Sequence, residues 1–290
     1  MNSTHISRIA QELNISARQV SATAELLSEG ATVPFISRYR KEATGSLDEV
    51  AVTDIRDRLE QLEVLDKRRE AILKSLVERE LLTPQLKNKI DDAENITVLE
   101  DLYLPFRPKR RTKATIAREA GLEPLALWIQ EAASAPNQEA VDEDPLPRAQ
   151  SFVNEEKEIL SAEDALSGAR HILSEIVNED ERARAAVRDL FITAGMIRTK
   201  VLSGKEEEGA KFRDYFEWEE PVGRAPGHRV LAMRRGEKEK ILSMRVSPPE
   251  DAAVHLLEGL FVKNRTSCGD QMRQAVADGY RRLLSMALET

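Results

Sequence analysis

The chain has 290 residues, of which 41% are hydrophobic, 32% are charged and only 4% are aromatic, and its net charge is −8. This length allows two domains or one large helical array, and the scarcity of aromatic residues favours a core of Leu, Ile, Val and Ala. No run of about 18 apolar residues is present, so we expect no membrane-spanning helix and no membrane partner. Without a signal peptide, and with Cys268 as its single cysteine, the chain is expected to be cytoplasmic.

The charge is distributed unevenly along the chain. Residues 1–130 have a net charge of −1, residues 131–220 of −11 and residues 221–290 of +4. An acidic protein is not drawn to nucleic acid by its net charge, so any such binding must depend on local basic patches.

The first thirty residues predict a pair of short helices. The stretch 9–27, IAQELNISARQVSATAELL, has a helix-turn-helix pattern in which Asn14 can adopt the left-handed turn conformation. Ser16 is expected to cap the second helix, with Gln19 three residues on. DNA reading and a purely structural pairing both remain open, because the second helix offers a single arginine to a phosphate backbone.

The stretch Gly30–Val50, GATVPFISRYRKEATGSLDEV, contains two helix boundaries. Thr32 is expected to cap a short helix, and Gly45 suits the stop of the segment. Ser46 and Glu49 have the spacing of a capping box, which predicts that the next helix begins at Ser46.

The same stretch combines two aromatic residues with a basic triplet. Phe35 and Tyr39 stand four residues apart and are expected to share a helix face with Ile36. The three cations project elsewhere: Arg38, Arg40 and Lys41. They are either a phosphate contact or cations that the helix dipole favours near a helix C-terminus.

Helical patterns dominate the rest of the chain, with one interruption. Residues 241–246, ILSMRV, alternate like a strand, and residues 136–147 are polar, acidic and rich in proline, as in an exposed connector. Helices are expected at residues 47–82, 84–94, 148–158, 161–177, 179–194, 250–262 and 267–288, and short helices flank a loop near residue 107.

These patterns predict a mainly α fold, namely an elongated multi-helix array with helix-turn-helix-like pairs and a small β element near residues 200–246. The expected parts are an N-terminal helical region at 1–135, the connector at 136–147, a central helical region with the small α/β element at 148–250, and helices at 251–290 that lead into a C-terminal part absent from this chain.

The strongest basic patch is the stretch 106–121, FRPKRRTKATIAREAG, which has a net charge of +5. Its cations can hold phosphates, and the neighbouring Phe106 can stack on a base. The candidate nucleic-acid-binding residues are Arg107, Lys109, Arg110, Arg111 and Lys113. The alternative is a solvated loop whose cations pair with the acidic central third of the same chain.

No catalytic or cofactor pattern emerges from the sequence. The four histidines lie far apart, and neither they nor Cys268 have metal-ligand spacing. Ser203, Gly204 and Lys205 lack the earlier glycine that a phosphate-binding loop requires. We therefore expect no enzyme, no catalytic residue, no metal, no cofactor and no small-molecule substrate, and we expect Cys268 to pack as a small apolar residue.

Three sequence blocks resemble the Tex family of bacterial transcription accessory proteins. They are GATVPFISRYRKEATGSLDEV, LEDLYLPFRPKRRTKATIAREAGLEPLA and GKEEEGAKFRDYFEWEEPVGRAPGHRVLAMRRGEKEKILSMRV. The resemblance implies an elongated, mainly helical cytoplasmic protein that binds RNA or DNA and associates with the transcription machinery. It also implies that a ribonuclease-H-like domain, helix–hairpin–helix motifs and an oligonucleotide-binding barrel follow this region.

We therefore interpret the chain as the N-terminal scaffold of a Tex-like accessory protein that binds nucleic acid without sequence preference. In the family the barrel is the main nucleic-acid-binding element, so the basic loop is expected to be an auxiliary contact. The alternative is a protein–protein interaction scaffold with no nucleic-acid binding of its own in this region.

Overall fold

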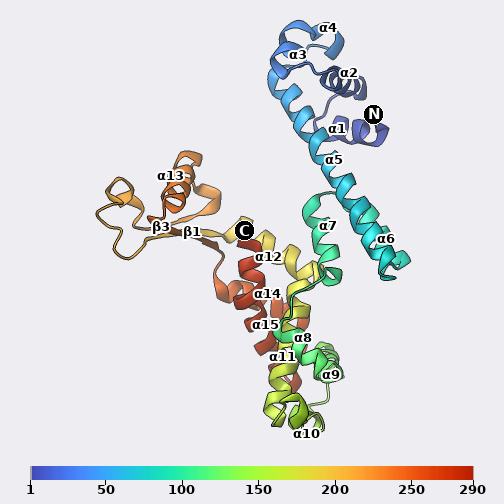
Figure 1. Ribbon diagram of the computed structural model, residues 1–290, viewed down its shortest axis with the longest axis vertical. Helices are drawn as coiled ribbons and strands as arrows, with labels where there is room; N and C mark the ends of the chain where they lie inside the picture. Colours follow the sequence, from blue (N-terminus) through green and yellow to red (C-terminus); the bar gives the residue numbers. More distant parts are fainter. Residues whose placement is uncertain (1, 290) are drawn as a thin grey trace. The chain divides into compact units, whose positions relative to one another are not determined.

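The computed structural model describes residues 2–289, and residues 1 and 290, the outer ends of the first and last predicted regions, lie outside the described part. The chain divides into two compact units, an N-terminal unit of residues Met1–Phe106 and a C-terminal unit of residues Arg107–Thr290. Both consist mainly of helices, and a small antiparallel sheet lies in the second (Figure 1). The predicted fold class, mainly α with a small β element, is therefore confirmed.

The N-terminal unit is entirely helical in its described residues. Its elements are α1 (Ser3–Glu12), α2 (Ala17–Ser28), α3 (Val33–Tyr39), α4 (Lys41–Thr44), α5 (Glu49–Glu78), α6 (Pro84–Asp92), α7 (Ile96–Tyr103) and a 3-10 turn (Leu104–Phe106). α5 is an amphipathic helix of 30 residues, and α1, α2, α3, α6 and α7 pack against it. That face buries Val52, Ile55, Leu62, Leu65, Ile72 and Leu76.

Local capping chemistry sets most boundaries of this unit. Asn14 has a φ of 53°, as expected for the turn between α1 and α2. Ser16 and Gln19 form the predicted capping box at the start of α2. Gly45 takes the left-handed conformation that ends α4.

The predicted cap of the long helix is wrong. Ser46 has a φ of 63° and lies outside α5, whereas Asp48 is the N-cap and its side chain accepts a hydrogen bond from the Ala51 backbone N–H at 2.8 Å. The positive φ of Ser46 continues the turn that Gly45 begins, so the N-cap and the first helical residue each lie two residues later than predicted.

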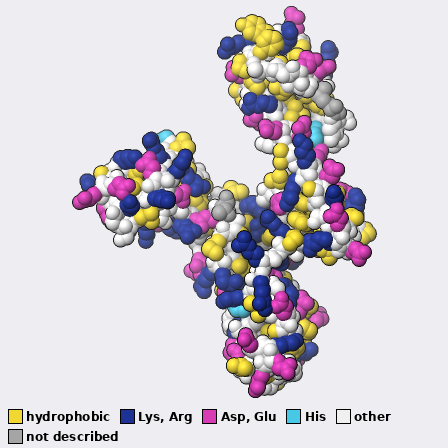
Figure 2. All heavy atoms as spheres, viewed as in Figure 1, with side chains coloured by type: hydrophobic (Ala, Val, Ile, Leu, Met, Phe, Trp, Pro, Cys, Tyr) yellow, Lys and Arg dark blue, Asp and Glu magenta, His cyan; other side chains and the backbone are white. Residues whose placement is uncertain are grey.

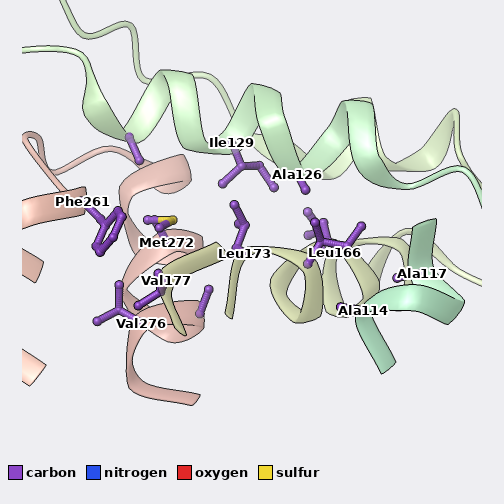
Figure 3. Close-up of a cluster of buried hydrophobic side chains, with 14 of the residues drawn as sticks. Ala114, Ala117, Ala126, Ile129, Leu166, Leu173, Val177, Phe261, Met272 and Val276 are labelled. Carbon is purple, nitrogen blue, oxygen red and sulfur yellow. The ribbon is translucent and has the colours of Figure 1, made fainter. Parts of the chain in front are cut away.

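The C-terminal unit has a helical core built around α11. Its helices are α8 (Lys113–Glu119), α9 (Glu123–Ser134), α10 (Pro145–Gln150), α11 (Ala162–Glu179), α12 (Glu181–Ala194), α13 (Gly227–Lys238), α14 (Glu250–Phe261), α15 (Ser267–Gly279) and α16 (Ser285–Glu289), with a π-helical turn at Tyr280–Leu284. α11 packs against α8, α9, α10 and α15, and apolar side chains from these helices meet in one core (Figure 3). Cys268 is 1% exposed in this core, and burial raises the pKa of its thiol to about 11, so it packs as the predicted small apolar residue.

The predicted helix over 148–158 is wrong. α10 ends at Gln150, and Asn154 and Ile159 instead form an isolated antiparallel bridge around a 3-10 turn, Glu155–Lys157. The Asn154 side chain accepts from the Lys157 backbone N–H at 3.3 Å, a local bond that competes with the helix.

The sheet has three strands in the order β2-β1-β3, all antiparallel. They are β1 (Met196–Val201), β2 (Glu217–Pro221) and β3 (Leu242–Ser247). In the central strand β1, Thr199 lies opposite Trp218 of β2 and Met244 of β3. The strand predicted at 241–246 corresponds to β3. α13 packs beside β3, as Figure 1 shows.

Candidate nucleic-acid interface

The basic loop, residues 107–113, joins the 3-10 turn Leu104–Phe106 to α8. Residues 107–112 have no regular secondary structure, and Pro108 cannot donate a backbone hydrogen bond there. The loop ends where Thr112 caps α8 by accepting a hydrogen bond from the Thr115 backbone N–H at 3.0 Å. The backbone is therefore fixed on its α8 side.

Lys109 is held inside the C-terminal unit. Its Nζ lies 2.5 Å from a carboxylate oxygen of Glu179 and 3.3 Å from one of Glu175, both on α11. The Lys109 side chain is 28% exposed, while those of Glu175 and Glu179 are 7% and 12% exposed. Since these charges are largely removed from water, the pairing ties the middle of the loop to α11.

Arg118 of α8 completes this charge cluster by bonding Glu175. Burial alone would raise the pKa of Glu175, but the cations Arg118 and Lys109 bring it below its ordinary value. For Glu179 burial is the stronger influence, and its pKa is raised despite the bond from Lys109. Two cations therefore neutralise the two carboxylates that face the loop.

The outer cations of the loop differ from Lys109. Arg111 pairs with Glu119 at 3.0 Å, but the two side chains are 68% and 56% exposed, so this surface pair stabilises the fold by at most about 1 kcal/mol. Arg107, Arg110 and Lys113 are exposed, and within residues 2–289 none of them makes a hydrogen bond or an ion pair. Three cations of the loop thus face solvent without an acidic partner in the described part of the chain.

A shallow cavity of about 240 Å³ lies beside Lys113, between α8 and α11. Lys157 and His171 also line it, and the Nδ1 atom of His171 is buried without a hydrogen-bond partner in the described residues. Burial, then the positive charge of Lys113, lowers the pKa of His171, so this imidazole is neutral near pH 7.

The structure thus divides the five predicted site residues into two groups. Lys109 is directed inward as in the alternative interpretation, in which the cations pair with the acidic central third. The other four remain on the surface, as a phosphate contact requires. Sequence reasoning did not identify Glu175 and Glu179 as anchors of the loop, because nothing in their own pattern indicates a partner more than sixty residues away.

Two other features considered from the sequence are a metal site and a membrane-spanning helix. No group of three or more His, Cys, Asp or Glu side chains among residues 2–289 is arranged to hold a metal ion. In the same described range, no helix combines the length and hydropathy that crossing a membrane requires.

Comparison with known families identifies the two parts of the chain. Residues 3–77 match the model described as the Tex-like protein N-terminal domain, and residues 140–288 match the model described as Tex central region-like. The chain belongs to the Tex family. The basic loop lies between the two matched regions.

Individual Tex relatives are similar over most of this chain. Transcriptional accessory protein Tex of Neisseria gonorrhoeae is 45% identical over 88% of this chain, and protein YhgF of Escherichia coli is 41% identical over 100% of this chain. The human S1 RNA-binding domain-containing protein 1 is 24% identical over 85% of the chain. The chain spans only 32%, 38% and 24% of these three relatives, respectively.

Proposed function

We propose that this chain supplies an auxiliary, sequence-independent nucleic-acid contact to a Tex-type transcription accessory protein in the cytoplasm. The observation that carries the proposal is the division of the basic loop. Lys109 fixes the loop to α11, while Arg107, Arg110 and Lys113 face solvent without a partner among residues 2–289. A loop held in this way presents its cations with little ordering cost when phosphates bind.

Electrostatics supports the contact despite the net charge of −8. The buried carboxylates that face the loop, Glu175 and Glu179, are already neutralised by Lys109 and Arg118, and the exposed Glu119 is paired with Arg111. The outward field of the loop is therefore positive within a Debye length of about 8 Å at physiological salt. Because these cations would contact phosphates and no base edges, binding would be independent of sequence.

The names of the relatives agree with this role. One is called a transcriptional accessory protein and another an S1 RNA-binding domain-containing protein. We propose that the nucleic acid is RNA or DNA of the transcription machinery, that the parent protein's remaining domains provide most of the affinity, and that this chain carries out no chemistry, without a cofactor or a small-molecule substrate.

The test is fluorescence anisotropy with single-stranded RNA and DNA oligonucleotides at several salt concentrations. We expect the double variant Arg107→Ala/Arg110→Ala to bind more weakly and to reduce the slope of log K against log[salt] by about 1.4, since each phosphate contact on a single strand contributes about 0.7. The matched control is Arg224→Ala/Arg265→Ala, which removes two other exposed cations of the same unit that have no partner in the described residues.

Two results would contradict the proposal. One is a wild-type Kd weaker than about 10⁻⁴ M, the weak end of non-specific affinities. The other is equal binding by the loop variant and the control. If the loop variant instead binds the oligonucleotides normally but no longer binds a purified transcription partner, the interpretation as a protein–protein interaction scaffold is correct. Metal-dependent cleavage of the oligonucleotides would show that the chain is an enzyme.

A further inference from the structure

The N-terminal unit exposes two aromatic rings on α3. Phe35 is 40% exposed and Tyr39 is 70% exposed, and their ring centroids lie 5.6 Å apart with the rings tilted by 41°. Ile36 on the same short helix is fully buried, so the expected common face of these three residues is wrong. α3 rests on the core through Ile36 and directs the two rings outward.

One cation lies over this aromatic pair, and two more are its neighbours in sequence. The guanidinium of Arg40 lies over the Phe35 ring, 5.2 Å from its centroid. Arg38 and Lys41 are exposed, and neither makes an ion pair or hydrogen bond within the described residues. Figure 2 shows hydrophobic side chains beside Lys and Arg side chains at the end of the unit that α3 and α4 form.

The charge of this end differs from that of the rest of the unit. Residues 33–44, which comprise α3, Arg40 and α4, contain three basic residues and one acidic residue, Glu42, whereas residues 1–106 contain 14 basic and 19 acidic residues. Several other arginines of the unit, for example Arg58 and Arg68, are bonded to carboxylates. A preference of cations for a helix end explains the position of Arg38, but it does not explain two exposed rings.

We propose that the surface formed by Phe35, Arg38, Tyr39, Arg40 and Lys41, here called the aromatic–basic surface, binds single-stranded nucleic acid. A base stacks on Tyr39, whose ring is the more exposed of the two, while Arg40 covers Phe35. Arg38 and Lys41 contact the adjoining phosphates. Aromatic stacking combined with cations along a backbone is the usual chemistry of sequence-tolerant single-strand binding.

The small apolar area favours a nucleic acid over a protein partner. Two rings that are 40% and 70% exposed match one or two bases. A stable protein interface buries about 800 Å² on each side, with an apolar centre. Arg38 and Lys41, whose side chains have no partner in the described residues, also favour a densely anionic ligand, as a phosphate backbone is.

This surface is separate from the basic loop. It lies in the N-terminal unit, whereas the loop lies in the C-terminal unit, and the two share no residue. The inference therefore does not rest on the proposed role of the loop, and either site can fail alone.

The test compares a pyrimidine oligonucleotide with an abasic oligonucleotide of the same length and charge. Wild-type chain is expected to bind the pyrimidine strand about tenfold more tightly, because only that strand can stack. Tyr39→Ala is expected to remove this difference, and Tyr39→Phe to keep it. The matched control is Val77→Ala, which truncates an apolar side chain of the same unit that is 59% exposed.

The outcomes separate the two sites. Arg107→Ala/Arg110→Ala is expected to weaken the binding of both strands and to leave their ratio unchanged. If Tyr39→Ala folds normally by circular dichroism and retains the wild-type ratio, the stacking site is overturned. It is likewise overturned if the variant keeps its oligonucleotide affinity but loses binding to purified RNA polymerase, since the surface would then be a protein contact.

Discussion

The side-chain nitrogen of Lys109 lies 2.5 Å from a carboxylate oxygen of Glu179, so a cation at the centre of the basic loop is directed into the protein. This relationship separates residues that hold the loop from residues that are free to contact a ligand. It also predicts different consequences for substitutions that remove the same charge from neighbouring positions.

Lys109→Ala is expected to lower the free energy of unfolding by about 1–3 kcal/mol, because two largely buried carboxylates lose a cation. Arg110→Ala, the matched control, should change it by less than about 0.5 kcal/mol because Arg110 is exposed and has no partner in the described residues. Urea unfolding followed by Trp128 and Trp218 fluorescence measures both. Adding Glu179→Gln to Lys109→Ala should restore part of the loss, and equal destabilisation by the two single substitutions would contradict the anchoring role.

Asn264 joins the end of α9 to the start of α15. It is 3% exposed, and its Nδ2 donates to the carbonyl oxygens of Ala132 at 2.7 Å and Ala135 at 2.8 Å, while its Oδ1 accepts from the Thr266 hydroxyl at 2.7 Å. Asn264→Ala leaves these buried groups without their partner and should cost about 2–4 kcal/mol of unfolding free energy.

The control for this substitution is Asn137→Ala, at an exposed position with no side-chain bond in the described residues. Thermal unfolding by circular dichroism should show a lower midpoint for Asn264→Ala and an unchanged one for the control. Similar midpoints for both variants would mean that the carbonyls of α9 find water as an adequate replacement.

Gly168 allows α11 to approach the turn between α8 and α9. A Cβ built on it lies 2.2 Å from Cδ1 of the buried Leu122, so Gly168→Ala requires a shift in the core and should destabilise by about 1–3 kcal/mol. A Cβ built on Gly259 of α14 meets open space instead. Gly259→Ala should therefore raise the free energy of unfolding by up to about 1 kcal/mol through helix propensity. Opposite shifts of the urea midpoint are expected, and shifts of the same sign would contradict the packing argument.

The sequence predicted those features that depend on local chemistry. Ser16 and Gln19 form a box within one turn, and Asn14 and Gly45 end segments through their own backbone preferences. The start of α5 was missed because Ser46 and Asp48 are both good caps, and the turn at Gly45 determines which of them precedes the helix.

The candidate site was predicted only in part, for a different reason. Composition located the cations of the loop, but the inward direction of Lys109 depends on α11, which is remote in sequence. The exposure of Tyr39 was likewise hidden, because spacing places Phe35 and Tyr39 together without showing which side of α3 faces the core. Tertiary packing decides both properties.

The remaining prediction concerns pH and the contact between α1 and α5. Both carboxylate oxygens of Glu12 accept hydrogen bonds from Arg58, at 2.7 and 2.8 Å, and Arg8 donates another at 2.9 Å. The bond from Arg58 is the main reason why the pKa of Glu12 is lowered to about 2. Because the folded pKa lies below the ordinary value of 4.5, the stabilisation is fully present above about pH 4.5 and is lost as the pH falls towards 2.

Glu12→Gln should therefore weaken the docking of α1 at pH 6 by about 1 kcal/mol. This is the upper end of the range for a surface ion pair, since the Glu12 side chain is 36% exposed. Hydrogen exchange of α1 peptides measures this directly, since both tryptophans lie in the other unit. The difference in protection between wild type and variant should shrink as the pH is lowered from 6 to 3. Asp54→Asn, at an exposed carboxylate of α5 without a partner in the described residues, is the control. A Glu12→Gln difference that is constant with pH would show that the contact depends on shape and not on the carboxylate charge.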